Sequence, residues 1–256
     1  MELATPLGII GVLVAVVVSL ILEGASPMSI VLIPPIILVL VGTFGAATAG
    51  GYITDLGIIK NQLVRAFTAK PSKSEEVVAE LVSMADLARR EGLLALEERA
   101  RTIEDPFLKQ GIEMTVDGTD GDEIYDVLHA KIKQKKKSDH VGTKYFADMG
   151  GYAPTIGIIG TVIGLIHVLS NLDKPEELGH LIAAAFVATL WGVMMANAVW
   201  LPISAKLKRI SEAEVAHLEM LLEGVMSIQA GTSPRVVEQR LRAISGDLGE
   251  SLKDAA

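Results

Sequence analysis

The sequence predicts an all-α integral membrane protein with four transmembrane helices, a helical cytoplasmic domain between the second and third, and a helical cytoplasmic tail. Half of the 256 residues are hydrophobic. Asp, Glu, Lys and Arg are absent from four long runs, residues 3–22, 24–54, 149–172 and 178–205. Each run reaches the roughly 20 residues that a helix needs to cross about 30 Å of hydrocarbon. A membrane barrel is excluded, because its strands would alternate with period two.

The four spans are expected at residues 4–22, 28–50, 149–171 and 180–204. The first run lacks the basic start and the small-residue cleavage site of a secretory signal, so we expect it to be retained as a helix. The predicted organisation is 1–54 for the first two spans, 55–148 for the cytoplasmic domain, 149–205 for the third and fourth spans, and 206–256 for the C-terminal helices. Cysteine is absent, which excludes disulfides and thiol chemistry.

The basic residues predict the orientation of the chain. Of the 23 Lys and Arg residues, only Lys174 lies outside residues 55–148 and 206–256. The positive-inside rule therefore places both of these segments, and both termini, in the cytoplasm. Only two short loops would face outward, which argues against a receptor or an adhesin.

The cytoplasmic segments carry helix signals. Ser72 and Glu75 have the spacing of a capping box. The fourth span is expected to continue into the cytoplasm as one long helix, and Ser233–Pro234 to open a last helix with proline at its first position.

Small residues recur every fourth position in the third and fourth spans. They allow helix backbones to approach closely in lipid. Packing within one chain accounts for most of them, and a central space filled by another chain is a second, compatible interpretation. The residues are Ala153, Gly157 and Thr161, then Gly160 and Gly164, and in the fourth span Ala184, Ala188, Gly192 and Ala196.

Two threonines and two prolines lie at matching depths in these antiparallel spans. Thr161 and Thr189 are near the middle of their runs, and Pro154 and Pro202 are near the cytoplasmic ends. A lone membrane threonine usually bonds the carbonyl one turn back, but two at one depth favour a common polar site. Paired prolines, each lacking a backbone donor, suggest a hinge or gate.

None of the four spans contains an acid. Proton-coupled membrane proteins usually place an ionisable carboxylate in the membrane. His167 and His180 fall towards the outer face, and we interpret them as interfacial. If the chain conducts ions, the carboxylate must come from a partner.

Several distinctive segments are spread along the chain. They are 88–97 (ARREGLLALE), 116–118 (VDG), 152–157 (YAPTIG), 178–180 (LGH) with 183–190 (AAAFVATL), and Pro202 with 206–208 (KLK). Together they make the chain resemble, over nearly its whole length, the MotA family of bacterial flagellar stator subunits, within the MotA/TolQ/ExbB proton channel family.

This resemblance implies a stator subunit of the bacterial inner membrane that takes part in motility and chemotaxis. Five copies would surround two copies of MotB, whose membrane helix supplies the missing aspartate, and the chain would act on the rotor protein FliG. It also implies that Pro154, Thr155, Thr161, Thr189 and Pro202 belong to the ion pathway and its gate.

The family's R-x-x-G-x-x-x-L-E pattern matches Arg89, Gly92 and Glu97. The resemblance implies that Arg89 and Glu97 contact the rotor, with Arg90 and Glu98 as adjacent charges that share the role. Without it, all four would be interpreted as an ordinary solvated helix surface.

The translocated ion is expected to be H⁺, because the segment 179–190 looks like proton-driven members. Thr161 leaves Na⁺ as an alternative ion, because sodium-driven members carry threonine at this position and hydroxyl oxygens suit hard cations. No cofactor, metal or nucleic-acid partner is expected.

Three other classes of function are weighed against this one. An energiser of the ExbB or TolQ kind has three spans, whereas two charge-free runs open this chain. An intramembrane enzyme is disfavoured because neither His-Glu-x-x-His nor Gly-x-Ser-x-Gly occurs. A structural scaffold would leave the matched proline and threonine depths unexplained.

Overall fold

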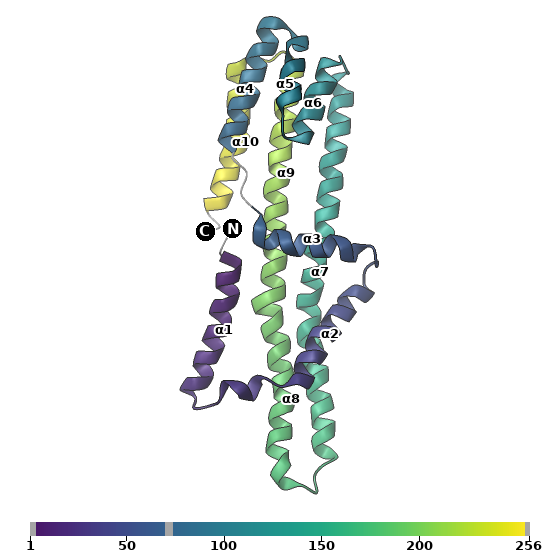
Figure 1. Cartoon of the computed structure of the whole chain (residues 1–256), viewed down its shortest axis with the longest axis vertical. Helices are drawn as coiled ribbons and strands as arrows, with labels where there is room; N and C mark the ends of the chain where they lie inside the picture. The colour runs from purple at the N-terminus through teal and green to yellow at the C-terminus, as the bar shows by residue number, and fades with distance from the viewer. Residues whose placement is uncertain (1–3, 70–73, 254–256) are drawn as a thin grey trace. The chain divides into compact units, whose positions relative to one another are not determined.

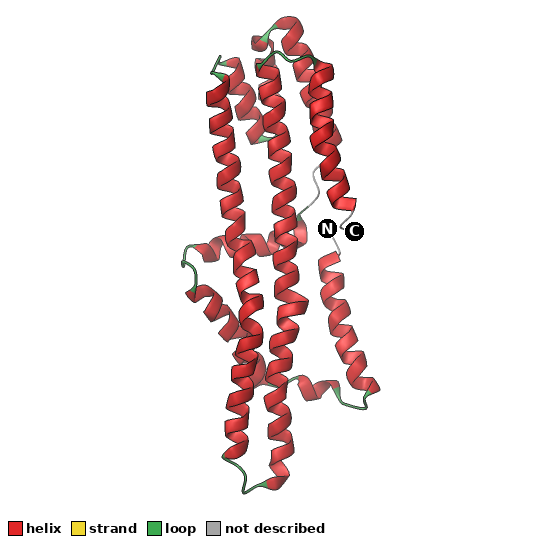
Figure 2. Cartoon of the chain, turned by 180° about the vertical axis from the view of Figure 1, so that it is seen from behind, coloured by secondary structure: helices red, strands yellow, loops and turns green. Residues whose placement is uncertain are grey.

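The computed structural model describes residues 4–69 and 74–253, and all regular elements in these ranges are helical (Figure 1; Figure 2 gives the reverse view). The all-α prediction is confirmed. The predicted capping box at Ser72 and Glu75 lies partly outside these ranges. In chain order the elements are α1 (Ala4–Leu22), η1 (Pro27–Ile30), α2 (Ile33–Ala49), α3 (Asp55–Thr68), α4 (Ser74–Glu91), η2 (Leu93–Ala95), α5 (Leu96–Thr102), α6 (Pro106–Val116), α7 (Gly121–Leu169), α8 (Pro175–Met195), η3 (Ala196–Trp200), α9 (Leu201–Gln229) and α10 (Pro234–Lys253).

The contacts divide the chain into two units. One comprises residues 1–70 and 138–209, and the other comprises residues 71–137 and 210–256. The helices α7 and α9 contribute residues to both. This division follows residue contacts, so it does not test the predicted boundaries at 54, 148 and 205, which describe membrane crossing.

Three helical stretches of the described residues are long and apolar enough to cross a membrane: Ala4–Leu22, Gly121–Leu169 and Pro175–Gln229. The helix α1 has the bounds predicted for the first span. The last stretch runs through α8, η3 and α9 without a break, which confirms the predicted continuation of the fourth span. The fourth candidate, α2, is apolar but has only 17 residues.

The predicted start of the second span at residue 28 is wrong, because α2 begins at Ile33. Pro34 and Pro35 occupy its first turn, where the backbone N–H groups that they lack would have no helical partner. The preceding residues form the separate helix η1, which begins at Pro27. The hydroxyl of Ser26 accepts a hydrogen bond from the Met28 N–H at 3.3 Å.

Small residues bring α7 and α8 into backbone contact. A Cβ added to Gly192 would lie 2.6 Å from the Ala153 carbonyl oxygen, and one added to Gly157 would lie 2.8 Å from the Ala188 carbonyl oxygen. Real Cβ atoms do not approach so closely, so only glycine fits these positions. Packing between helices of one chain, expected for most of these residues, is therefore confirmed at this contact.

A buried ion pair fixes α3 against α7 in the first unit. The Asp139 carboxylate, whose residue is 4% exposed, accepts hydrogen bonds from Arg65 Nη1 at 2.7 Å and from Gln62 Nε2 at 2.9 Å. Breaking a buried pair by removing one partner costs about 3–5 kcal/mol, because an uncompensated charge is left.

The second unit has its own apolar core. Side chains of α4, α5, α6, α9 and α10, with the first part of α7, meet in it, and α10 packs along α4. At the start of α6, the Asp105 carboxylate accepts hydrogen bonds from the N–H groups of Phe107 and Leu108, an N-cap typically worth about 1 kcal/mol. The largest fully buried side chains of this core are Leu81, Leu96, Leu108, Ile112, Ile124, Leu128, Met220, Leu221, Ile228 and Leu241.

Replacing Gly192 by alanine should destabilise the protein, because the added methyl group meets the Ala153 carbonyl and pushes α7 and α8 apart. We expect a loss of roughly 1–3 kcal/mol, the usual cost of overpacking. The thermal aggregation midpoint of the detergent-solubilised protein measures it. Gly179, in the same helix with nothing within 4 Å of an added Cβ, provides the matched control Gly179→Ala. Equal midpoints for the two variants would contradict the close approach.

Candidate functional site

The hydroxyl groups of Thr161 on α7 and Thr189 on α8 are hydrogen-bonded to each other, with their oxygens 2.5 Å apart. Both residues are half-buried. The backbone contact at Gly157 places them together, because an added Cβ there would lie 3.1 Å from the Thr189 Cα. The structure thus brings together the two threonines that the sequence placed at one depth.

Backbone carbonyls complete this polar cluster. The Thr161 hydroxyl lies 3.2 Å from the Gly157 oxygen and 3.1 Å from the Ala185 oxygen. The Thr189 hydroxyl lies 3.4 Å from the same Gly157 oxygen. Bonding to the carbonyl one turn back is the ordinary state of a helical threonine, but here the bonds also cross between helices. Two hydroxyls and two carbonyls can orient water or offer oxygen ligands to a hard cation.

No acid takes part in the cluster, and among the described side chains of residues 4–69 and 75–244 no three His, Asp or Glu residues gather as a metal site. The charge-free runs contain neither Asp nor Glu. A proton carrier at this depth would therefore have to come from another chain.

Pro154 and Thr155 lie on α7, one to two turns before Thr161. Pro154 is half-buried inside a helix that continues through it. Thr155 is exposed, and its hydroxyl donates to the Tyr152 carbonyl at 2.8 Å, so it does not join the Thr161–Thr189 cluster.

Pro202 follows a π-helical turn, η3, that sequence reasoning missed. The N–H of Leu201 bonds the Ala196 oxygen five residues back. Pro202 itself has no N–H to give to the Ala198 carbonyl, so the regular ladder is interrupted here. Pro202 was the only sequence signal for an irregular helix here, but a proline does not show whether the helix kinks or forms a wider π turn.

The four candidate rotor residues form a charged corner, defined here as Arg89 and Arg90 of α4 with Glu97 and Glu98 of α5, and all four are exposed. Between them Gly92 has φ of +88°, which L-residues with side chains rarely adopt.

Two of these charges are neutralised within the chain. Arg90 pairs with Asp86 at 2.6 Å, and Glu97 pairs with Arg101 at 2.9 Å. Arg89 and Glu98 have no ion pair within the part of the chain that the structure describes. These two are therefore the charges most available to a partner, together with Leu94, which is 73% exposed in the same corner.

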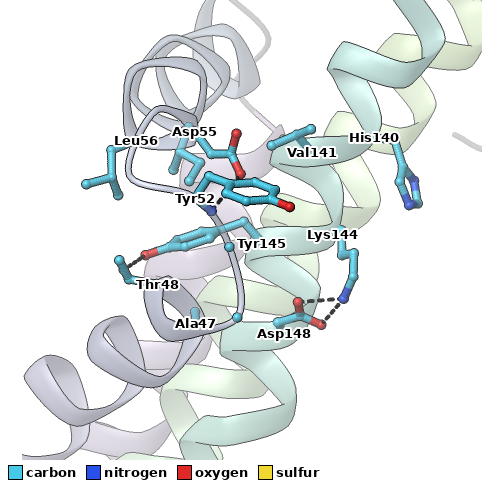
Figure 3. A pocket seen from close by; sticks show the side chains of 13 residues that line it. Ala47, Thr48, Tyr52, Asp55, Leu56, His140, Val141, Lys144, Tyr145 and Asp148 are labelled. Carbon is cyan, nitrogen blue, oxygen red and sulfur yellow. Dashed lines mark hydrogen bonds and ion pairs between the residues drawn. The ribbon is translucent and has the colours of Figure 1, made fainter.

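A pocket that sequence reasoning did not anticipate lies where α2 turns into α3 beside α7. It has a volume of about 140 Å³. Figure 3 shows the Tyr145 phenol reaching the Thr48 hydroxyl, at 2.9 Å, and the Lys144 amine reaching both oxygens of Asp148. The hydrogen bond and negative charge of Asp148 raise the pKa of Lys144 above its ordinary value.

Comparison with known proteins decides the family. Residues 99–220 match the MotA/TolQ/ExbB proton channel family. Over 242 residues the chain is 38% identical to motility protein A of Bacillus subtilis strain 168. The matched residues make up 94% of this chain and 90% of the relative. The chain belongs to the MotA/TolQ/ExbB proton channel family.

Solved structures agree with this membership in the MotA/TolQ/ExbB family. The C. jejuni MotAB structure matches with a TM-score of 0.91 and 31% identity over 95% of this chain and 96% of that one. The flagellar MotAB stator complex from Bacillus subtilis matches with a TM-score of 0.87 and 37% identity over 93% of each chain. The family resemblance inferred from the sequence is confirmed.

The contact between the two threonines can be tested by cross-linking, because the chain has no natural cysteine. We expect the double variant Thr161→Cys with Thr189→Cys to form a disulfide when membranes are oxidised, since touching side chains bring the Cβ atoms near the roughly 3.5–4.5 Å that a disulfide needs. A mobility shift after protease cleavage between the helices measures it. Thr155→Cys with Thr189→Cys is the control on the same two helices and should stay reduced. Cross-linking of the control alone would show a different helix register.

Proposed function

We propose that this flagellar stator subunit forms an ion channel with MotB and converts ion flow across the bacterial inner membrane into torque on the rotor. The observation that carries the proposal is the hydroxyl pair Thr161–Thr189, which lies within the charge-free runs 149–172 and 178–205, where no acid occurs. A membrane aspartate from a MotB dimer would supply the carboxylate that such a pathway needs. Related chains occur in MotAB complexes, which supports this partner.

The proposed topology has four spans, with both termini in the cytoplasm. The helix α2, with 17 residues, falls at the lower limit of roughly 17–25 residues for a membrane helix. Counting α2 as a span gives an even number, so that the lysine- and arginine-rich segments 55–148 and 206–256 share the cytoplasmic side.

The proposed ion is H⁺. In the Thr161–Thr189 pair each hydroxyl already has an oxygen partner in the chain, so the cluster can orient water without a metal ion. The same oxygens would suit Na⁺, which makes a sodium-driven stator the alternative. Pro154 and Pro202 would gate the pathway on its cytoplasmic side.

The charged corner is the proposed contact with the rotor protein FliG, in a ring of five copies. Rotor contact needs charges that the stator subunit does not already neutralise. Arg89 and Glu98 meet this condition, whereas Arg90 and Glu97 would have to exchange their internal partners. Ion pairs at exposed sites are weak, typically below about 1 kcal/mol, so such a contact can be made and broken repeatedly.

Swimming speed tests the proposed ion. We expect a stator-null strain that expresses this chain with its cognate MotB to swim at a speed independent of sodium at fixed pH, and to stop when a protonophore is added. Thr161→Ala should then leave swimming largely intact. Speed that rises with sodium and is lost in Thr161→Ala would show the sodium-driven alternative, and no motility with the complex confirmed in the membrane would refute the stator proposal.

Reversing the two unpaired charges, Arg89→Glu with Glu98→Lys, should abolish motility without lowering ion flux, because the ion pathway lies in the other unit of the chain. Swimming-halo diameter and proton uptake by membrane vesicles measure the two effects. Glu113→Lys, at an exposed position on α6, is the matched control. Normal motility of the double reversal would mean that the corner is an ordinary solvated surface.

A further inference from the structure

The π-helical turn η3 lies within the last charge-free run, residues 178–205. A π turn is rare and is found mostly as a single turn at functional sites. In a membrane, irregular backbone is tolerated where protein or a water-lined cavity surrounds it. Whether protein or a water-lined cavity surrounds the π turn therefore indicates its function.

One side of η3 is covered by its own chain. The helix α1 packs against it, and Ala196 and Ala198 are buried. Asn197, between them, is exposed. Intrachain packing thus explains the two alanines but not the asparagine.

Asn197 interrupts an apolar strip on α8. At about 100° per residue, Phe186, Leu190, Val193 and Asn197 fall within an arc of about 60°. The first three are exposed hydrophobic side chains. Thr189 borders the strip, about 40° from Val193, so the strip and the hydroxyl pair share an edge.

The hydrogen bonding of Asn197 leaves an acceptor free. Its Nδ2 donates to the Val193 carbonyl at 2.9 Å. A carbonyl can only accept, so the amide nitrogen must face it and the Oδ1 atom must face away. Oδ1 has no hydrogen-bond partner among the described side chains of residues 4–69 and 75–244.

The depth of Asn197 makes an exposed amide costly in lipid. The residue lies about 8 Å from the centre of the charge-free run, at 1.5 Å per residue, and therefore inside a hydrocarbon layer about 30 Å thick. A polar atom without a hydrogen bond is costly in hydrocarbon, and here this applies to the amide oxygen. Asn197 also lies between Thr189 and Pro202 in depth, on the cytoplasmic side of the hydroxyl pair.

We propose that Asn197 is a further ion-path residue, whose Oδ1 accepts a hydrogen bond from the hydrated monovalent cation as it passes between the Thr161–Thr189 pair and the cytoplasm. The inference rests on the proposed stator function and adds a polar step to its pathway. The π turn holds the amide towards the path, while its buried neighbours Ala196 and Ala198 face the rest of the chain.

The test compares Asn197→Ser with Asn197→Ala, two side chains that differ by one hydroxyl group. Each variant is expressed with its cognate MotB in a stator-null strain, and rotation is recorded with a small bead, at low load, and a large bead, at high load. Ion transit limits the speed at low load, whereas the rotor contact limits the torque at high load. We expect Asn197→Ala to rotate roughly tenfold more slowly than wild type at low load, as when one charge-assisted hydrogen bond is lost, with a smaller effect at high load.

Asn197→Ser should keep most of the wild-type speed, because its hydroxyl still offers an acceptor. Val193→Ala, on the same strip, is the control for lost apolar surface and should rotate as wild type does. Equal speeds for Asn197→Ala and Asn197→Ser would overturn the inference, as would loss of both variants from the membrane complex, which would show a packing role. Failure of the wild-type chain to rotate the bead would instead refute the proposed function, and this inference with it.

Discussion

The close approach of α7 and α8 is the constraint on which the polar site depends. Glycine at 157 and 192 lets each backbone lie against the carbonyls of the other helix. In lipid there is no hydrophobic force between helices, so their association relies on this close van der Waals packing. The hydroxyls of Thr161 and Thr189 meet only because the backbones touch. Larger side chains at this contact would separate the helices and leave two ordinary threonines, each bonded to its own helix.

Charged side chains are distributed unevenly along the chain. The charge-free runs carry no acid, whereas the one deeply buried carboxylate among the described residues, Asp139, lies outside them and is held by Arg65 and Gln62. A carboxylate at that place braces α3 against α7. The buried charge of this chain is thus structural and lies outside the charge-free runs, which is consistent with the proposal that a partner supplies the carboxylate of the pathway.

The sequence predicted features that depend on local composition. Charge-free runs predicted the apolar helices, with the right bounds for α1, and Pro234 predicted the start of α10. The matched depths of Thr161 and Thr189 pointed to a shared polar site, and the structure places them in contact. These predictions worked because helix length, proline geometry and membrane depth are nearly independent of the rest of the fold.

Features that depend on pairing were not predicted. Arg65 and Asp139 are 74 residues apart, and nothing local marks them as partners. The start of α2 was placed too early, because apolar residues before Pro34 do not show that the chain turns there. The π turn at Ala196–Trp200 has no local signal beyond Pro202. Glu97 and Arg101 have the i,i+4 spacing of a helical ion pair, which could have been recognised in the sequence. Because they pair, Glu98 rather than Glu97 is the acid of the charged corner without an internal ion pair.

Gly92 has a consequence for how this surface can vary among related chains. Its positive φ sets the turn between α4 and α5, although a side chain there would meet no atom within 4 Å. Exchanges among the exposed charges beside it alter only surface interactions, which are weak and adjustable. A side chain at position 92 would strain the backbone and shift the spacing of every charge at once. In divergence from a common ancestor, the exposed charges can therefore change one by one, while the residue without a side chain at position 92 has to stay.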